Sequence, residues 1–222
     1  MEKAFEKILL AYDNSPAAKA ALQSAYGVHT RFNSQISALV VSGDDSDEIA
    51  SKEALKVFAA EKGISIEIIE GDGKVYDEVE RLEKSSDFGL ILLGSHGVSG
   101  WKKLFVGSNA FKVVSKSTCP TITVTAKASS PELKHILLPL SEDRNTRQKV
   151  PYCITMAKAF GATVHILGAS TSKSEDTLRR IRGYVNQTET FLLERGVKCT
   201  THIDVSSKVA DLCINYAEEV GA

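Results

Sequence analysis

The sequence lacks the features that would place it in a membrane, at a zinc site or in an oxidising compartment. Across its 222 residues no apolar run approaches the length needed to span a bilayer, and its first residues show no secretory signal. The four cysteines form no C-x-x-C pair, which favours reduced thiols, and the five histidines show no metal-ligand spacing. A net charge of -1 argues against non-specific nucleic-acid binding. We therefore expect a cytoplasmic protein without membrane or nucleic-acid partners and without a protein-bound metal.

Two common nucleotide-binding motifs are also missing. The P-loop pattern G-x-x-x-x-G-K-[ST] does not occur, and neither does the dinucleotide pattern G-x-G-x-x-G. Gly71-Asp72-Gly73 supplies only G-x-G and leads into a different helix. Their absence argues against an efficient P-loop ATPase and against a dinucleotide-dependent enzyme.

What the chain does contain is a regular alternation of buried strands and amphipathic helices. Strands are predicted at residues 7–12, 36–41, 64–69, 90–93 and 121–125. This alternation predicts right-handed crossovers in a parallel sheet, an α/β doubly wound Rossmann-like fold with strand order 3-2-1-4-5. In that order the ligand crevice lies between the first and fourth strands, at whose carboxyl ends Asp13 and Gly94 stand.

After a short linker the pattern restarts. Residues 134–138 echo 6–10, and residues 160–164 echo 32–36, both at an offset of 128 (135 − 7 and 160 − 32). We therefore expect a complete domain at 1–128 and a partial second copy of the same fold at 132–222. The second copy stops before a counterpart of the fourth strand, which leaves its first strand at an apolar edge. Truncation of a longer tandem protein is the favoured explanation, and coverage by a partner is the alternative.

The most informative stretch follows the fourth strand. Gly94 and Gly97 are followed, after nine further residues, by Gly107 and Ser108. Glycines let backbone amides approach a ligand, and the next helix offers free N–H groups with Ser108 or Asn109 as its N-cap. This arrangement predicts an anion cradle suited to phosphate, although glycines are also common in tight turns that bind nothing.

In this stretch a strand leads into GSHG, nine further residues, GS, a helix, CP and a second strand. This order resembles the ATP-binding signature of the universal stress proteins. The resemblance covers residues 5–125 fully and 132–222 in part. It implies an adenine nucleotide, ATP with Mg²⁺ on its phosphates, and a homodimer formed through the first domain. It also implies that Ser95, Ser99 and Ser108 could accept phosphate, since some family members autophosphorylate.

Several site residues follow from the resemblance. It implies that Asp13 contacts the adenosine part of the nucleotide, that Val41 packs against adenine and that Ala11 makes a backbone contact. Asp13 has an alternative role as a helix cap, in competition with its neighbours. The full implied nucleotide-binding set is Ala11, Asp13, Val41, Gly94, Gly97, Gly107, Ser108 and Asn109, with no catalytic residue.

Three functions remain open on the sequence. The first is an ATP-binding stress-response regulatory module in which turnover is slow or absent. The second is a slow ATPase or autophosphorylating enzyme that uses the same pocket, and it lacks a visible residue to activate a nucleophile. The third is a nucleotide-free scaffold of the same fold. In the second copy Ser141 replaces Asp13 and no glycine motif follows, so we expect that copy to hold no nucleotide.

Overall fold

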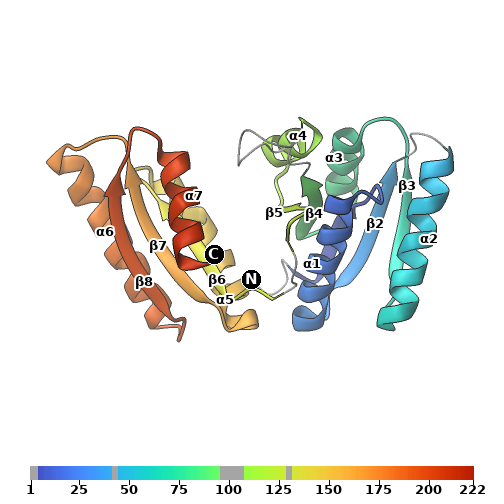
Figure 1. The fold of residues 1–222 in the computed structure, drawn as a ribbon, viewed down its shortest axis with the longest axis horizontal. Coiled ribbons are helices and arrows are strands. Elements are labelled where there is room, and N and C mark those ends of the chain that lie inside the picture. The colour runs from blue at the N-terminus through green and yellow to red at the C-terminus, as the bar shows by residue number, and fades with distance from the viewer. Residues whose placement is uncertain (1–4, 42–44, 96–107, 129–131) are drawn as a thin grey trace. The chain divides into compact units, whose positions relative to one another are not determined.

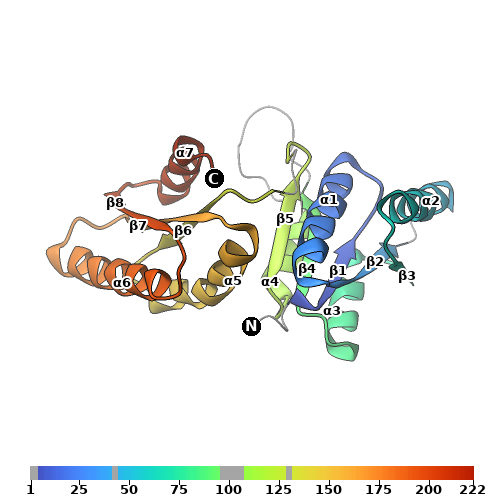
Figure 2. The same cartoon turned by 90° about the horizontal axis from the view of Figure 1, so that it is seen from below.

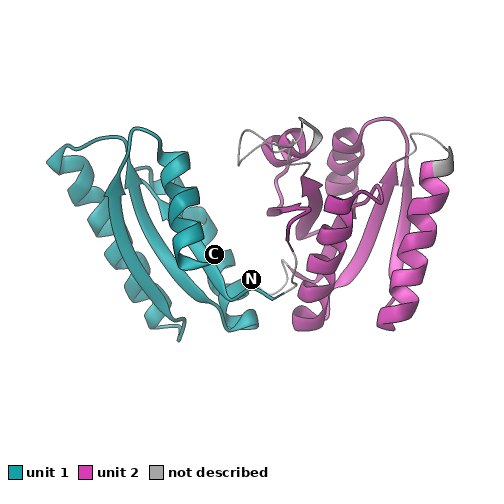
Figure 3. Cartoon of the chain, viewed as in Figure 1, with its two compact units in different colours: residues 1, 132–222 teal, residues 2–131 magenta. Residues whose placement is uncertain are grey.

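The computed structural model describes residues 5–41, 45–95, 108–128 and 132–222. The chain divides into two compact units, one within Glu2–Pro131 and the other within Glu132–Ala222 (Figure 3). None of the helices in the described ranges is long and apolar enough to cross a membrane.

The first unit is a five-stranded sheet with helices on both faces (Figure 1). Every strand pair is parallel, and the order is β3-β2-β1-β4-β5, which confirms the fold and strand order predicted from the sequence. Its elements are β1 (Lys7–Ala11), α1 (Pro16–Phe32), β2 (Gln35–Val41), α2 (Asp45–Lys62), β3 (Ile66–Gly71), α3 (Val75–Ser85), β4 (Leu90–Ser95), α4 (Ser108–Lys116) and β5 (Thr121–Thr125).

The central strands are apolar because both faces of the sheet are covered. Alternate residues such as Leu9 and Ile91 join Val79 of α3 and Val113 of α4 in one buried cluster. Figure 2 shows α1 on the opposite face from α3. Each fully buried Leu or Ile contributes roughly 1.5–3 kcal/mol through burial, so these strands form the stable centre of the unit.

The limits of the helices follow local chemistry, with one correction. Ser15 caps α1, its Oγ accepting from the backbone N of Ala18 at 3.2 Å, and Pro16 is the first helical residue. We predicted Ser108 or Asn109 as the N-cap of the fourth helix. The prediction was wrong, because α4 already begins at Ser108 and both residues lie inside it. A capping residue adopts a non-helical backbone conformation, and these two are helical.

The second unit repeats the first three strands. Its elements are β6 (His135–Leu140), the 3₁₀ helix η2 (Arg144–Lys149), α5 (Val150–Phe160), β7 (Thr163–Ser170), α6 (Glu175–Leu193), β8 (Cys199–Val205) and α7 (Val209–Val220). The strands pair in parallel in the order β6-β7-β8, so β6 is an edge of the described sheet.

The pairing register shows that the sequence repeat is a structural repeat. Ile8 pairs with Ile36 in the first unit, and Ile136 pairs with Val164 in the second, each partner displaced by 128 (136 − 8 and 164 − 36). After the second helix the displacement grows. The two α–β turns contain equivalent left-handed glycines, Gly63 with φ 64° and Gly196 with φ 72°, which are 133 residues apart (196 − 63).

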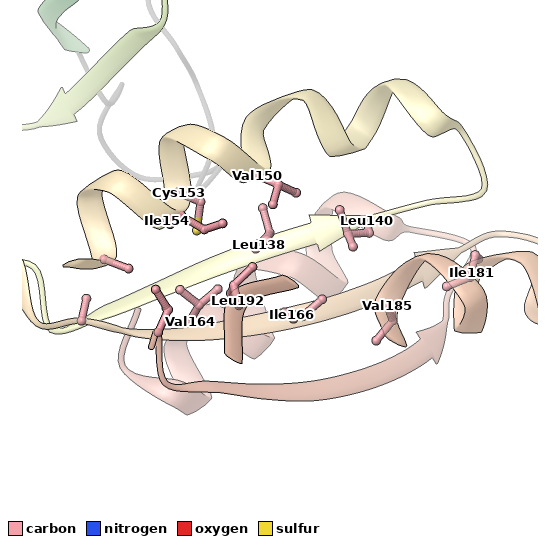
Figure 4. Packing of buried hydrophobic residues seen from close by; sticks show 13 residues of the cluster. Leu138, Leu140, Val150, Cys153, Ile154, Val164, Ile166, Ile181, Val185 and Leu192 are labelled. Atoms are coloured by element: carbon pink, nitrogen blue, oxygen red, sulfur yellow. The ribbon is translucent and has the colours of Figure 1, made fainter. Parts of the chain in front are cut away.

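The core of the second unit lies on one face of its sheet. Leu138 of β6 and Ile166 of β7 pack under Ile154 of α5 and Val185 of α6 (Figure 4). The helix α7 lies on the opposite face (Figure 2), and none of its residues is fully buried. The two faces of this unit are therefore unequally covered within the part of the chain that the structure describes.

Candidate functional site

The candidate site lies where the strand order of the first unit reverses. From β1 the chain passes through α1 to β2 on one side, and it later returns through α3 to β4 on the other side. Ala11, the last residue of β1, pairs with Leu39 of β2 and Leu93 of β4. The carboxyl ends of three strands thus meet at one edge, the usual position for a ligand in an open α/β sheet.

Two of the apolar residues of the predicted site lie at this edge on the same face. Ala11 ends β1, and Val41 ends β2 opposite Gly71 of β3. Both side chains are partly buried and pack against the apolar cluster under α3 and α4. They therefore form an apolar floor that is not fully covered by the unit's own side chains.

Asp13 is exposed immediately after β1. Its Oδ1 accepts a hydrogen bond from the backbone N of Ser15 at 3.1 Å, and Ser15 in turn caps α1. The capping role that Asp13 could have taken therefore belongs to Ser15. The second carboxylate oxygen of Asp13 accepts no hydrogen bond from the described residues.

Two neighbours of Asp13, Tyr12 and Asn14, were not among the site residues predicted from the sequence. Asn14 has a left-handed backbone with φ 58°, a conformation that asparagine tolerates better than most residues. Its Oδ1 accepts from the hydroxyl of Tyr12 at 3.2 Å, and Tyr12 is only 4% exposed. Burial, and then the charge of Asp13, raise the pKa of Tyr12. An asparagine directly after a buried strand was the available signal.

Gly94 is required by packing of the helix on the strand. A Cβ at this position would lie 2.6 Å from the carbonyl carbon of Ala17 and 2.6 Å from the backbone N of Ala18. The first turn of α1 therefore rests directly on the end of β4. This is a different reason for glycine than the ligand approach predicted from sequence. It also brings the segment that follows Asp13 close to Gly94.

The remaining members of the predicted cradle are only partly described. Ser108 and Asn109 form the start of α4, and Gly97 and Gly107 lie outside the described residues. Ser95 is corrected as a possible phosphate acceptor, because it is 4% exposed and its hydroxyl donates to the carbonyl of Val124 at 3.4 Å. A buried hydroxyl is not accessible to a phosphate donor.

Positive charge gathers near the start of α3. The ammonium groups of Lys74, Lys112 and Lys116 lie 5.8, 4.6 and 5.1 Å from the ring centroid of Tyr76. Tyr76 packs against the same cluster as Ala11 and Val41. Lys116 is paired with Glu80 at 3.6 Å, and the first turn of α3 also carries Asp77 and Glu78. Because α3 begins at the carboxyl edge of the sheet, Lys74 and Lys112 can contribute attraction for an anionic ligand there.

Neither cysteine nor metal chemistry is visible in the described part of the chain. All four cysteines are free thiols, and burial raises the pKa of Cys119 and of Cys153 to about 11 each. Thiols with such a pKa are poor nucleophiles at neutral pH. The described residues contain no group of three or more His, Cys, Asp or Glu side chains that could hold a metal ion.

The second unit builds the corresponding loop without the carboxylate. Ser141 stands at the position of Asp13, and its Oγ accepts from the backbone N of Asp143 at 3.2 Å, as Oδ1 of Asp13 accepts from Ser15. A hydroxyl is therefore sufficient for this turn. Gly168 stands at the position of Val40. It allows α6 to pack closely on β7, because a Cβ there would lie 2.7 Å from Cγ2 of Ile181 in α6.

A sequence profile decides the family. The profile of the universal stress protein family matches residues 4–125, more than half of the chain. The chain belongs to the universal stress protein family. Within this family, universal stress protein YxiE of Bacillus subtilis is 32% identical over 54% of this chain and 99% of its own length. Universal stress protein Slr1230 of Synechocystis is 25% identical over 53% of this chain and 42% of its own length.

Solved structures extend the likeness to the second unit. A universal stress protein from Archaeoglobus fulgidus matches 98% of this chain and 84% of its own length, with TM-score 0.75 and 19% identity. A Pseudomonas aeruginosa protein placed in the same family matches 100% of this chain and 81% of its own length, with TM-score 0.74 and 21% identity. At this identity the likeness shows the fold alone, which is complete in the first unit and partial in the second.

Proposed function

We propose that the first unit is an ATP-binding regulatory module, with Mg²⁺ on the phosphates of the nucleotide. The observation that carries the proposal is the exposed carboxylate of Asp13 at the reversal point of the sheet, whose second oxygen accepts no hydrogen bond from the described residues. The same turn is made in the second unit by Ser141, so the turn does not require a charge at Asp13. An acidic group that the fold does not need is well suited to accept hydrogen bonds from a ribose.

The surroundings of Asp13 support a nucleotide. Ala11 and Val41 offer an apolar floor for adenine, and the lysines around Tyr76 favour phosphate groups. The backbone amides at the start of α4 are the expected phosphate donors. Because the second unit has Ser141 and Ala169 at the positions of Asp13 and Val41, we propose that it holds no nucleotide.

Regulation is favoured over efficient catalysis. Phosphoryl transfer needs an acid that holds the metal and a group that positions the nucleophile. No described histidine or second carboxylate is hydrogen-bonded to Asp13, and the described residues contain no acidic cluster that could hold a metal ion. We therefore propose that binding changes the conformation or the partner choice of the protein. Slow hydrolysis or autophosphorylation is the second candidate.

We also propose a homodimer through the first unit, in which β5 is an edge strand.

A titration of the chain with ATP and Mg²⁺, followed by an assay for released phosphate, tests the proposal. The Asp13→Ala variant should weaken binding by about tenfold or more, the typical loss for a hydrogen bond to a charged group. Ser141→Ala is the matched control, because it alters the equivalent turn of the second unit, and it should bind as the unaltered chain does. Tight binding with rapid phosphate release would favour the enzyme, and absence of binding would favour the scaffold.

A further inference from the structure

The second unit contains a hollow that the nucleotide proposal does not use. It has a volume of about 470 Å³ and lies between the η2–α5 segment and α6. This volume is within the range of sites for small ligands, roughly 300–1,000 Å³. The lining residues used below are Arg144, Arg147, Val150, Pro151, Gln187 and Phe191.

The charged groups that line the hollow are cationic, and the other polar lining residues are neutral. Arg144 and Arg147 both line it, and none of the described residues that line it is acidic. The guanidinium of Arg147 stacks 4.1 Å from the ring centroid of Tyr184, and its Nη1 donates to Oε1 of Gln187 at 3.0 Å. The Nε of Arg147 is buried and has no hydrogen-bond partner among the described residues. Because Arg147 and Arg144 both line the hollow without an acidic neighbour in the lining, their guanidinium groups favour an anionic ligand.

The rest of the wall is apolar. Val150 and Pro151 of α5 and Phe191 of α6 line the hollow. Phe191 is 38% exposed, and the guanidinium of Arg195 covers part of its ring, 3.4 Å from the centroid. The part of the Phe191 ring that remains exposed, together with Val150 and Pro151, can contact a ring of the ligand while the anionic group of the ligand meets the arginines.

The first unit treats the same place differently. Phe58 stands 133 residues before Phe191, and equivalent turn hydrogen bonds support this alignment: Ile64 N to Ala59 O in one unit and Val197 N to Leu192 O in the other. Phe58 is only 8% exposed and meets Tyr26 edge to face, with ring centroids 5.9 Å apart. In the second unit the position of Tyr26 is taken by Ile154, at the offset of 128. The aromatic cover over this position is therefore absent there.

We propose that this hollow binds a small organic anion that carries an aromatic ring, such as an aryl phosphate or aryl carboxylate. Arg147 and Arg144 bind the anionic group. Phe191, Val150 and Pro151 hold the ring. Because Arg147 is held by Tyr184 and Gln187 before any ligand arrives, less side-chain entropy is lost on binding.

The test uses the full chain and three probes. Phenyl phosphate and benzyl alcohol are followed by ligand-observed proton NMR, and inorganic phosphate is followed by phosphorus-31 NMR. Phenyl phosphate should bind saturably and at least about tenfold more tightly than the other two, because only it offers both the charge and the ring. Arg144→Gln and Arg147→Gln should each weaken phenyl phosphate binding by about tenfold, and Phe191→Ala should weaken it by a smaller factor.

Arg179→Gln is the matched control, because Arg179 is an exposed arginine of α6 paired with Asp176 and does not line the hollow. It should leave binding unchanged. Arg144 is itself exposed, so its variant should keep the circular dichroism spectrum of the unaltered chain even if Arg147→Gln perturbs the fold. Equal binding of inorganic phosphate, or full affinity in both Arg144→Gln and Arg147→Gln, would overturn the proposal. ATP affinity at the first unit should not change in either variant.

Discussion

The two units of this chain share a backbone framework and differ in what their side chains do with it. In both, the first two strands pair in the same register, and a residue 128 positions apart caps the following helix, Ser15 in one and Asp143 in the other. Yet α1 is a regular helix from Pro16 onward, whereas its counterpart begins as the 3₁₀ helix η2. The comparison separates residues that the fold requires from residues that are available for binding.

Gly94 provides the largest test of this separation. Gly94→Ala would place a Cβ against the backbone of α1 and should destabilise the first unit by about 2–3 kcal/mol, a typical cost of overpacking. Gly183 in α6 of the second unit is the matched control, because a Cβ there meets nothing within 4 Å. Gly183→Ala should stabilise the protein by up to about 1 kcal/mol. Urea denaturation measures the change in the free energy of unfolding for both variants. Equal changes would show that packing of α1 on β4 does not require glycine at position 94.

Glu83 provides the next test, at a junction found only in the described part of the first unit. Its Oε1 accepts from Oγ of Ser117 at 2.7 Å and from the backbone N of Thr118 and of Cys119, each at 3.0 Å. Removing it leaves the backbone N of Thr118 without this acceptor, while Ser117 and Cys119 keep only the hydrogen bonds that they make with each other, so Glu83→Ala should cost about 1–2 kcal/mol. The exposed Glu194 of the second unit is the control, and Glu194→Ala should change stability by less than about 0.5 kcal/mol.

The same carboxylate gives a pH dependence with a definite sign. Burial acts to raise the pKa of Glu83, but hydrogen bonds from Ser117, Cys119 and Thr118 outweigh it, and the pKa is lowered. The unfolded chain therefore takes up the proton first as the pH falls. The stabilisation should be complete above the unfolded pKa of about 4.3 and should be lost as the pH falls through the folded pKa. In Glu83→Gln this acid-dependent loss should be smaller, as urea titrations at several pH values would show.

The N-caps of α1 and η2 allow a direct comparison of the two units. Ser15→Ala should cost about 1 kcal/mol, because the N-terminal amide of Ala18 loses its acceptor. Asp143→Ala removes the equivalent cap of the second unit, where Oδ1 of Asp143 accepts from the backbone N of Asn145 at 2.8 Å. This cap begins only a short 3₁₀ helix. Its expected cost is about 0.5 kcal/mol or less. Thermal unfolding measures the difference, and a larger loss in Asp143→Ala would reverse the order.

His165 gives the smallest expected effect and concerns the second unit alone. His165 is 8% exposed, its Nε2 lies 3.0 Å from Nδ1 of His135, and burial followed by the proximity of His135 lowers its pKa. The unfolded chain therefore binds the proton first, and stability should fall as the pH drops below the ordinary histidine pKa of about 6.5. His165→Gln should flatten unfolding profiles between about pH 7 and pH 5. The exposed His202 is the control, and an unchanged profile in His165→Gln would contradict the assignment.

Much of the fold could be predicted from the sequence because it depends on local pattern. Buried strands, the Ser15–Pro16 helix start and the constant offset of the repeat are visible as residue types at fixed spacings. The parallel sheet then follows from the alternation of strands and helices. The predicted strand limits and strand order also placed Asp13 and Gly94 at the carboxyl ends of two neighbouring strands, where the structure has them.

What could not be predicted depends on contacts between distant segments. The contact of Gly94 with Ala17 and Ala18 joins residues far apart in the chain, so the sequence offered only a generic reason for the glycine. The cluster of lysines around Tyr76 needs α3 and α4 side by side. The start of α4 was misplaced because a serine can stand in the first turn as well as before it.

The most direct test of the central claim is the number of ATP molecules bound per chain, measured by calorimetric titration in the presence of Mg²⁺. The account predicts one site per chain, lost in Gly107→Val, weakened in Asp13→Ala and unchanged in Ser141→Ala. Two sites per chain, or one site that survives Gly107→Val and Asp13→Ala but is lost in Ser141→Ala, would contradict it.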